Sequence, residues 1–129
     1  MHEFSTMSGI VNAVKEEGRR HGADAITKVV LEIGELTFLG EEQLRFAFDV
    51  LTRDTEMEGA ELVIEKVEPK VRCICGYEGA VEYDEKEEFH IQFPILRCPV
   101  CGSDVEITSG RECLIKNIEI EVEDVPSQG

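Results

Sequence analysis

The sequence has little positive charge and no long hydrophobic run. Only 13 lysine and arginine residues stand against 28 acidic ones, which gives a formal net charge of -15. This charge would repel a phosphate backbone or an anionic lipid surface, so neither nucleic acid nor a membrane is an expected partner. No stretch approaches the roughly 18 consecutive apolar residues of a membrane helix, and the amino terminus lacks the basic and apolar blocks of a signal peptide. We therefore expect a cytoplasmic protein.

Sequence signatures of catalysis are also absent. The chain contains no recognisable serine, histidine and carboxylate set, no phosphate-binding loop and no cofactor fingerprint. Its 129 residues are enough for one modest core together with a small metal-stabilised module. The missing signatures predict that the chain is not an enzyme.

Hydrophobic periodicity predicts two helices and three strands. Apolar residues recur at three- and four-residue steps over residues 4–14, which is typical of an amphipathic helix, and Ser5 or Thr6 is expected to cap it. A second helix is expected between Gly40 and Asp54, with acidic residues in its first turn. Strands are expected at residues 26–33, 60–67 and 114–122. The pattern predicts an α+β fold with two helices packed on a small three-stranded sheet.

Residues 71–110 differ from the rest of the chain. They contain four cysteines, an acidic run at residues 82–88 and too few apolar residues for a separate core. We therefore expect an inserted zinc-ribbon-like module at residues 71–110. The α+β domain would comprise residues 1–70 plus 111–124, and residues 125–129 would form a flexible tail.

The cysteine spacing predicts a metal site in this module. Cys98 and Cys101 are separated by two residues and followed by a glycine, the pattern of a zinc knuckle. Cys73 and Cys75 would complete four thiolate ligands for a structural zinc ion. Four thiolates leave no open coordination position, so a zinc hydrolase is not expected.

The first cysteine pair has only one residue between its members, where zinc ribbons normally have two or more. The sequence therefore leaves open whether Cys113 or His90 replaces one ligand of this pair. Otherwise Cys113 is expected to be a small buried apolar residue, as free cysteines often are.

The amino terminus offers a second metal site. The α-amine of Met1, the backbone nitrogen of His2 and its imidazole would close a five-membered and a six-membered chelate ring around one ion. Deprotonation of an amide nitrogen favours Ni(II) or Cu(II), which gain from planar coordination, over zinc. Glu3 would supply a fourth ligand through its amide or its carboxylate. His21, near the end of the first helix, is expected to be an ordinary surface residue.

Several segments together resemble the HypA-type hydrogenase maturation proteins. They are Met1-His2-Glu3, residues 31–36, residues 46–48, the late pair of cysteines and residues 118–121. The resemblance implies a nickel metallochaperone that works with a partner GTPase and delivers Ni(II) to the large subunit of nickel-iron hydrogenase; some members also serve urease. It implies nickel ligation by Met1, His2 and Glu3, and structural zinc ligation by Cys73, Cys75, Cys98 and Cys101.

A second interpretation is a zinc-ribbon protein-interaction adaptor in which the histidine at position 2 is incidental. Such a protein would bind one zinc ion and no nickel. The number of bound metal ions therefore distinguishes the two interpretations.

Overall fold

The chain divides into two compact units. The computed structural model describes residues 2–81 and 96–123. One unit, which we call the helical unit, comprises Met1–Glu32, Leu39–Glu65 and Leu114–Gly129. The other, the cysteine unit, comprises Ile33–Phe38 and Lys66–Cys113. Each unit is described separately.

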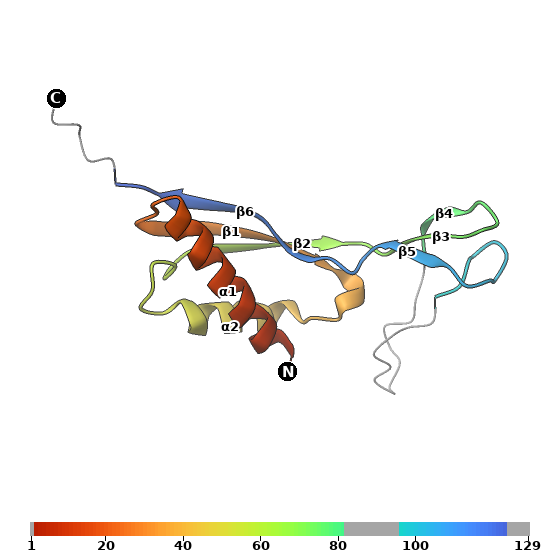
Figure 1. The fold of residues 1–129 in the computed structure, drawn as a ribbon. Helices are drawn as coiled ribbons and strands as arrows, with labels where there is room; N and C mark the ends of the chain where they lie inside the picture. The colour runs from red at the N-terminus through yellow and green to blue at the C-terminus, as the bar shows by residue number, and fades with distance from the viewer. Residues whose placement is uncertain (1, 82–95, 124–129) are drawn as a thin grey trace, which may run out of the picture. The chain divides into compact units, whose positions relative to one another are not determined.

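The helical unit contains two helices and most of a three-stranded sheet. The helices are α1 (His2–Arg20) and α2 (Glu41–Thr52). The strand order of the sheet is β2-β1-β6, with β1 (Ala25–Gly34) between β2 (Glu61–Val67) and β6 (Cys113–Glu121). Both helices lie on the same side of this sheet (Figure 1). The predicted arrangement of two helices and a three-stranded sheet is confirmed.

Apolar side chains from all of these layers form the core of the helical unit. Met7 and Val14 of α1, Leu44 of α2, and Val29 and Leu31 of β1 are each 0% exposed. Complete burial of a side chain of this size stabilises a fold by about 1.5–3 kcal/mol. The three- and four-residue spacing in the helices and the β-branched run in β1 place these residues on facing surfaces.

Helix α1 begins earlier than the sequence indicated. It starts at His2, so Ser5 lies inside the helix and its hydroxyl donates to the carbonyl of His2 at 3.2 Å. Ser5 and Thr6 are therefore not caps, and that prediction is wrong. An acidic residue, Glu3, occupies the first turn, where it interacts favourably with the helix dipole. Neither α1 nor α2 is long and apolar enough to cross a membrane, and no other described segment is a helix of that kind.

The cysteine unit contains a second, smaller sheet. Its central strand β3 (Lys70–Arg72) pairs antiparallel with β4 (Glu78–Ala80) and with β5 (Glu106–Ser109). Strands of three or four residues leave no room for a visible alternation, which explains why the sequence did not predict them. Among the described residues of this unit, Val71, Val81 and Leu96 form a buried core. The acidic run at residues 82–88 and the predicted tail at residues 125–129 lie outside the described residues.

Candidate functional site

The two cysteine pairs converge on one point in the cysteine unit. The sulfurs of Cys73 and Cys101 lie 3.5 Å apart, and those of Cys75 and Cys98 lie 3.6 Å apart. All four sulfurs lie within 4.8 Å of one another. Sulfurs bound at about 2.3 Å around a tetrahedral ion would be separated by about 3.8 Å. The four thiols thus fit a tetrahedral metal and form a four-cysteine metal-binding site.

The second cysteine pair is a closed knuckle. The Gly102 amide donates to the Cys98 carbonyl at 2.9 Å, and the φ of Gly102 is +74°, a conformation that favours glycine. The amides of Val100 and Cys101 both donate to the Cys98 sulfur at 3.4 Å. Such contacts stabilise a thiolate, and they orient the Cys98 sulfur toward the other three.

The first pair closes a similar turn with one residue fewer. The Gly76 amide donates to the Cys73 carbonyl at 3.0 Å, and the Cys73 amide donates to the Tyr77 carbonyl at 2.9 Å. Gly76 has a φ of +100°. The spacer residue Ile74 is 100% exposed, so its side chain lies outside the turn. This arrangement brings Cys73 and Cys75 to the cluster despite the short spacer.

The four thiols differ in their affinity for a proton. The Ser103 hydroxyl and amide, followed by the Cys73 thiol, lower the pKa of Cys101 to about 6. The Cys75 amide lowers the pKa of the Cys73 thiol. Burial and the three neighbouring sulfurs together have a larger, opposite effect, and they raise this pKa to about 12. Like charges at this distance oppose ionisation of all four thiols together. A divalent cation would supply the positive charge that allows all four thiols to ionise together.

Of the two alternative zinc ligands, Cys113 lies within the described residues and His90 does not. Among the described residues, the cluster contains Cys73, Cys75, Cys98 and Cys101, and Cys113 is not part of it. Cys113 is exposed at the start of β6, so the prediction that it is buried is wrong. The reason is that β6 lies at the edge of its sheet, although enough of the sulfur is shielded for burial to raise the pKa of the Cys113 thiol. His90 lies outside the described residues.

The predicted nickel ligands lie at the start of α1. His2 is exposed and opens the helix, whereas Glu3 is half-buried. The Gly40 amide donates to the Glu3 carboxylate at 3.0 Å. The α-amino group of the chain, followed by this amide, lowers the pKa of the Glu3 carboxyl to about 2. Met1 lies outside the described residues.

A groove lies beside this terminus in the helical unit. It is lined by Glu3, Phe4, Glu42, Gln43, Phe46 and Ala47. Phe4 is 50% exposed and Phe46 is 67% exposed. The hydrogen bond from the Gly40 amide to the Glu3 carboxylate was not predicted, because it joins residues that are 37 positions apart in the sequence.

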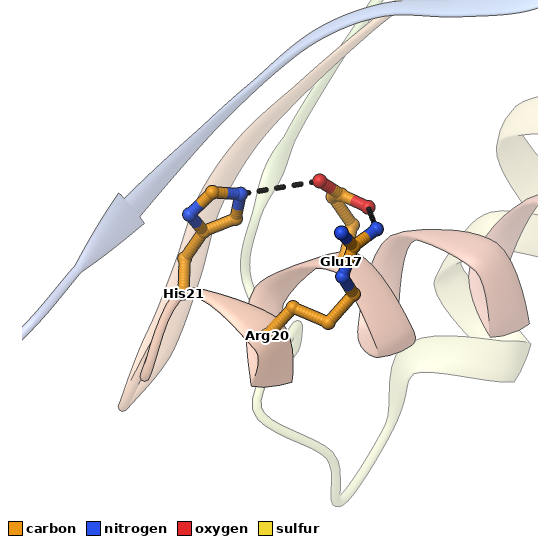
Figure 2. Close-up of polar contacts among 3 residues, drawn as sticks. All are labelled: Glu17, Arg20 and His21. Carbon is orange, nitrogen blue, oxygen red and sulfur yellow. Dashed lines mark hydrogen bonds and ion pairs between the residues drawn. The ribbon is translucent and has the colours of Figure 1, made fainter.

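His21 is an exposed residue just after α1, as expected. Its Nε2 lies 3.1 Å from one oxygen of Glu17, and the guanidinium of Arg20 lies 3.1 Å from the other (Figure 2). Exposed ion pairs of this kind contribute little to stability. Glu17 thus joins the two basic side chains at the end of the helix, and the group resembles an ordinary polar surface.

Comparison with known proteins gives the family of the chain. Residues 1–120 match the family model described as "HypA: Hydrogenase/urease nickel incorporation, metallochaperone, hypA". The hydrogenase maturation factor HypA of Methanothermobacter thermautotrophicus is 42% identical over 125 residues, which cover 96% of this chain and 100% of that protein. The corresponding factor of Methanocaldococcus jannaschii is 39% identical over 131 residues, covering 96% and 100%.

Two solved structures share the fold. The solution structure of the nickel metallochaperone HypA from Helicobacter pylori has a TM-score of 0.64 at 22% identity and covers 94% of this chain and 98% of its own. A second solution structure, of a HypA protein, has a TM-score of 0.67 at 24% identity, with 95% and 98% covered. The family match, the full-length relatives and the shared fold agree, and the chain therefore belongs to the HypA family of nickel-incorporation metallochaperones, which are not enzymes.

Proposed function

We propose that this protein carries Ni(II) as cargo for the maturation of nickel-iron hydrogenase, and that Met1, His2 and Glu3 hold the ion. The α-amine of Met1 with the amide nitrogen and imidazole of His2 form two adjacent chelate rings, and Glu3 supplies a fourth donor. Planar coordination through a deprotonated amide nitrogen selects Ni(II) or Cu(II) over zinc. The family match to nickel-incorporation metallochaperones supports nickel as the cargo.

The observation that carries this proposal is the position of the first helical turn. Because α1 begins at His2, the amides of His2 and Glu3 fall in a turn where N–H groups have no carbonyl acceptor within the helix. Either amide can lose its proton to a metal without breaking a helical hydrogen bond. The positive end of the helix dipole also favours a deprotonated ligand, and the exposed His2 is accessible to an ion from solvent.

The second metal in this proposal is structural zinc. Cys73, Cys75, Cys98 and Cys101 would hold it, since four converging thiolates without an open position are typical of structural zinc sites. Residues 71–110 would form the zinc-binding module, and residues 1–70 plus 111–124 the nickel-binding domain. The expected partners are a hydrogenase maturation GTPase and the hydrogenase large subunit, in the cytoplasm.

An amino-terminal extension tests the nickel site. Addition of a few residues before Met1 converts the α-amine into an amide and removes a ligand, so high-affinity nickel binding should be lost while zinc binding is retained. The matched control carries the same residues after Gly129. Nickel titration of each protein by calorimetry makes the comparison, and equal nickel affinity of the two extended proteins would overturn the site assignment.

Metal analysis of the unextended protein separates this function from a zinc-binding adaptor. A nickel carrier should contain one zinc ion and bind one further nickel ion after incubation with Ni(II). An adaptor should contain the zinc ion and bind no nickel. The two outcomes differ by a whole equivalent of metal, which elemental analysis after gel filtration resolves.

A further inference from the structure

The N-cap residue of α2 does not cap the helix through a side chain. This residue is Gly40, which has no side chain that could form a capping hydrogen bond. The Gly40 carbonyl accepts the first helical hydrogen bond, from the Leu44 amide, at 2.9 Å. In a capping box, a glutamate or glutamine in the first helical turn accepts the N–H of the N-cap residue. In this protein, the acceptor of the Gly40 N–H is Glu3, which belongs to α1.

The contact therefore joins the first turns of two helices. Glu3 is the second residue of α1, and Gly40 directly precedes α2. The bond is 3.0 Å long and partly buried, and it connects a charged acceptor to a backbone donor. Hydrogen bonds of this type are stronger than those between neutral groups.

Most of the described side chains in the first turn of α1 are exposed. His2, Phe4 and Ser5 are exposed, and the first fully buried side chain of the helix is Met7. Helix ends without partners for their amides fray readily. The bond from Gly40 to Glu3 is thus well placed to keep the turn helical, and the predicted nickel donors lie in that turn.

We infer that the Glu3 carboxylate is a positioning group: it fastens the nickel-binding first turn of α1 to the start of α2 and remains bound to Gly40 when nickel is present. This inference rests on the proposed nickel site. The two parts of Glu3 then have different roles: its backbone would bind the metal, and its carboxylate holds the turn in place. A turn that is already ordered binds a metal more tightly than one that must be ordered first.

Three variants separate positioning from ligation. Glu3→Ala removes the acceptor, whereas Glu3→Gln keeps an oxygen that can accept from Gly40. Gly40→Pro removes the donor from the other side, and the φ of -76° at Gly40 is compatible with proline. Any Cβ at Gly40 displaces the side-chain oxygen of Gln43, so Gly40→Ala, which keeps the N–H, is the control for this displacement. Glu42→Gln is the control, because it removes a carboxylate from the first turn of α2 that lines the same groove.

The first measurement is amide exchange of Gly40. In the metal-free protein, Glu3→Ala should speed this exchange by about tenfold or more, Glu3→Gln by less, and Glu42→Gln little. One equivalent of Ni(II) should leave the Gly40 amide of the unmodified protein protected. Loss of this protection on adding nickel would show that the carboxylate leaves Gly40 for the metal, which overturns the inference.

The second measurement is the visible absorption spectrum and affinity of bound nickel. Glu3→Ala and Gly40→Pro should weaken nickel binding by about tenfold with an unchanged spectrum, and Glu3→Gln should largely restore affinity. A changed spectrum in both Glu3 variants but not in Gly40→Pro would identify the carboxylate as a ligand and overturn the inference. Failure of the unmodified protein to bind nickel would refute the proposed function instead, and the exchange data on the metal-free variants would still decide whether the contact holds the turn. Zinc content and circular dichroism verify that each variant is folded.

Discussion

The two units of this protein differ in what holds them together. In the helical unit, α1, α2 and β1 contribute fully buried apolar side chains to one core. In the part of the cysteine unit that the structure describes, a small core of Val71, Val81 and Leu96 lies in the same unit as four converging thiols. The helical unit thus resembles an ordinary small domain, whereas the described part of the cysteine unit combines a small apolar core with a cluster of thiols that a metal would cross-link.

Under the proposed function, this difference would let one short chain hold two metals for different purposes. A metal in the cysteine cluster would be surrounded by its ligands and would act as part of the fold. A metal at the start of α1 would bind at the exposed end of a helix whose stability comes from apolar packing. The first ion should be costly to remove, while the second can enter and leave without unfolding the protein.

Removal of zinc should produce the largest effect and should act on one unit only. Structural zinc contributes about 10–16 kcal/mol of binding free energy in zinc-finger peptides at pH 7. Chelation should therefore abolish amide protection in β3, β4 and β5 while leaving that of α1 and β1 largely intact. Hydrogen exchange before and after chelation measures this, and restoration by added zinc is the control. Persistent protection of Val71 after verified zinc loss would contradict the comparison.

A core substitution in the helical unit should produce the opposite pattern. Leu31 lies in β1 and is 0% exposed, so Leu31→Ala should lower the free energy of unfolding of this unit by about 2–5 kcal/mol. Zinc content should remain at one equivalent. Leu114→Ala is a matched control, because Leu114 is 44% exposed and its loss should cost less than about 1 kcal/mol. Denaturant unfolding followed by circular dichroism compares the two, and equal losses would contradict the assignment of Leu31 to a packed core.

Local sequence patterns predicted the parts of the molecule that local patterns determine. The spacing of Cys98 and Cys101 and the apolar period of α1 are properties of short segments, and the structure contains both features. The contact between Glu3 and Gly40 was not predictable, because it depends on how two helices are placed in the fold. The burial of Cys113 was wrongly predicted because residue type does not reveal that β6 is an edge strand.

The smallest expected effect lies inside the cysteine cluster. Each pair contains one buried member, Cys73 at 5% exposed or Cys98 at 3%, and one exposed member, Cys75 or Cys101. A water molecule can replace a lost sulfur more readily at an exposed position than at a buried one. Cys73→Ser and Cys98→Ser should therefore weaken zinc binding by about tenfold more than Cys75→Ser and Cys101→Ser.

Competition with a chromogenic chelator measures the zinc affinity of all four variants, and the exposed Cys113 provides the control, since Cys113→Ser should leave zinc affinity unchanged. The zinc affinities could instead follow the pairs, with Cys98 and Cys101 both contributing more than Cys73 and Cys75. That order would show that the one-residue spacer lowers the contribution of the first pair more than burial raises that of Cys73. Zinc loss in Cys113→Ser alone would contradict the ligand set itself. An order set by burial would show that exclusion of water from a sulfur determines how much that sulfur contributes to zinc affinity.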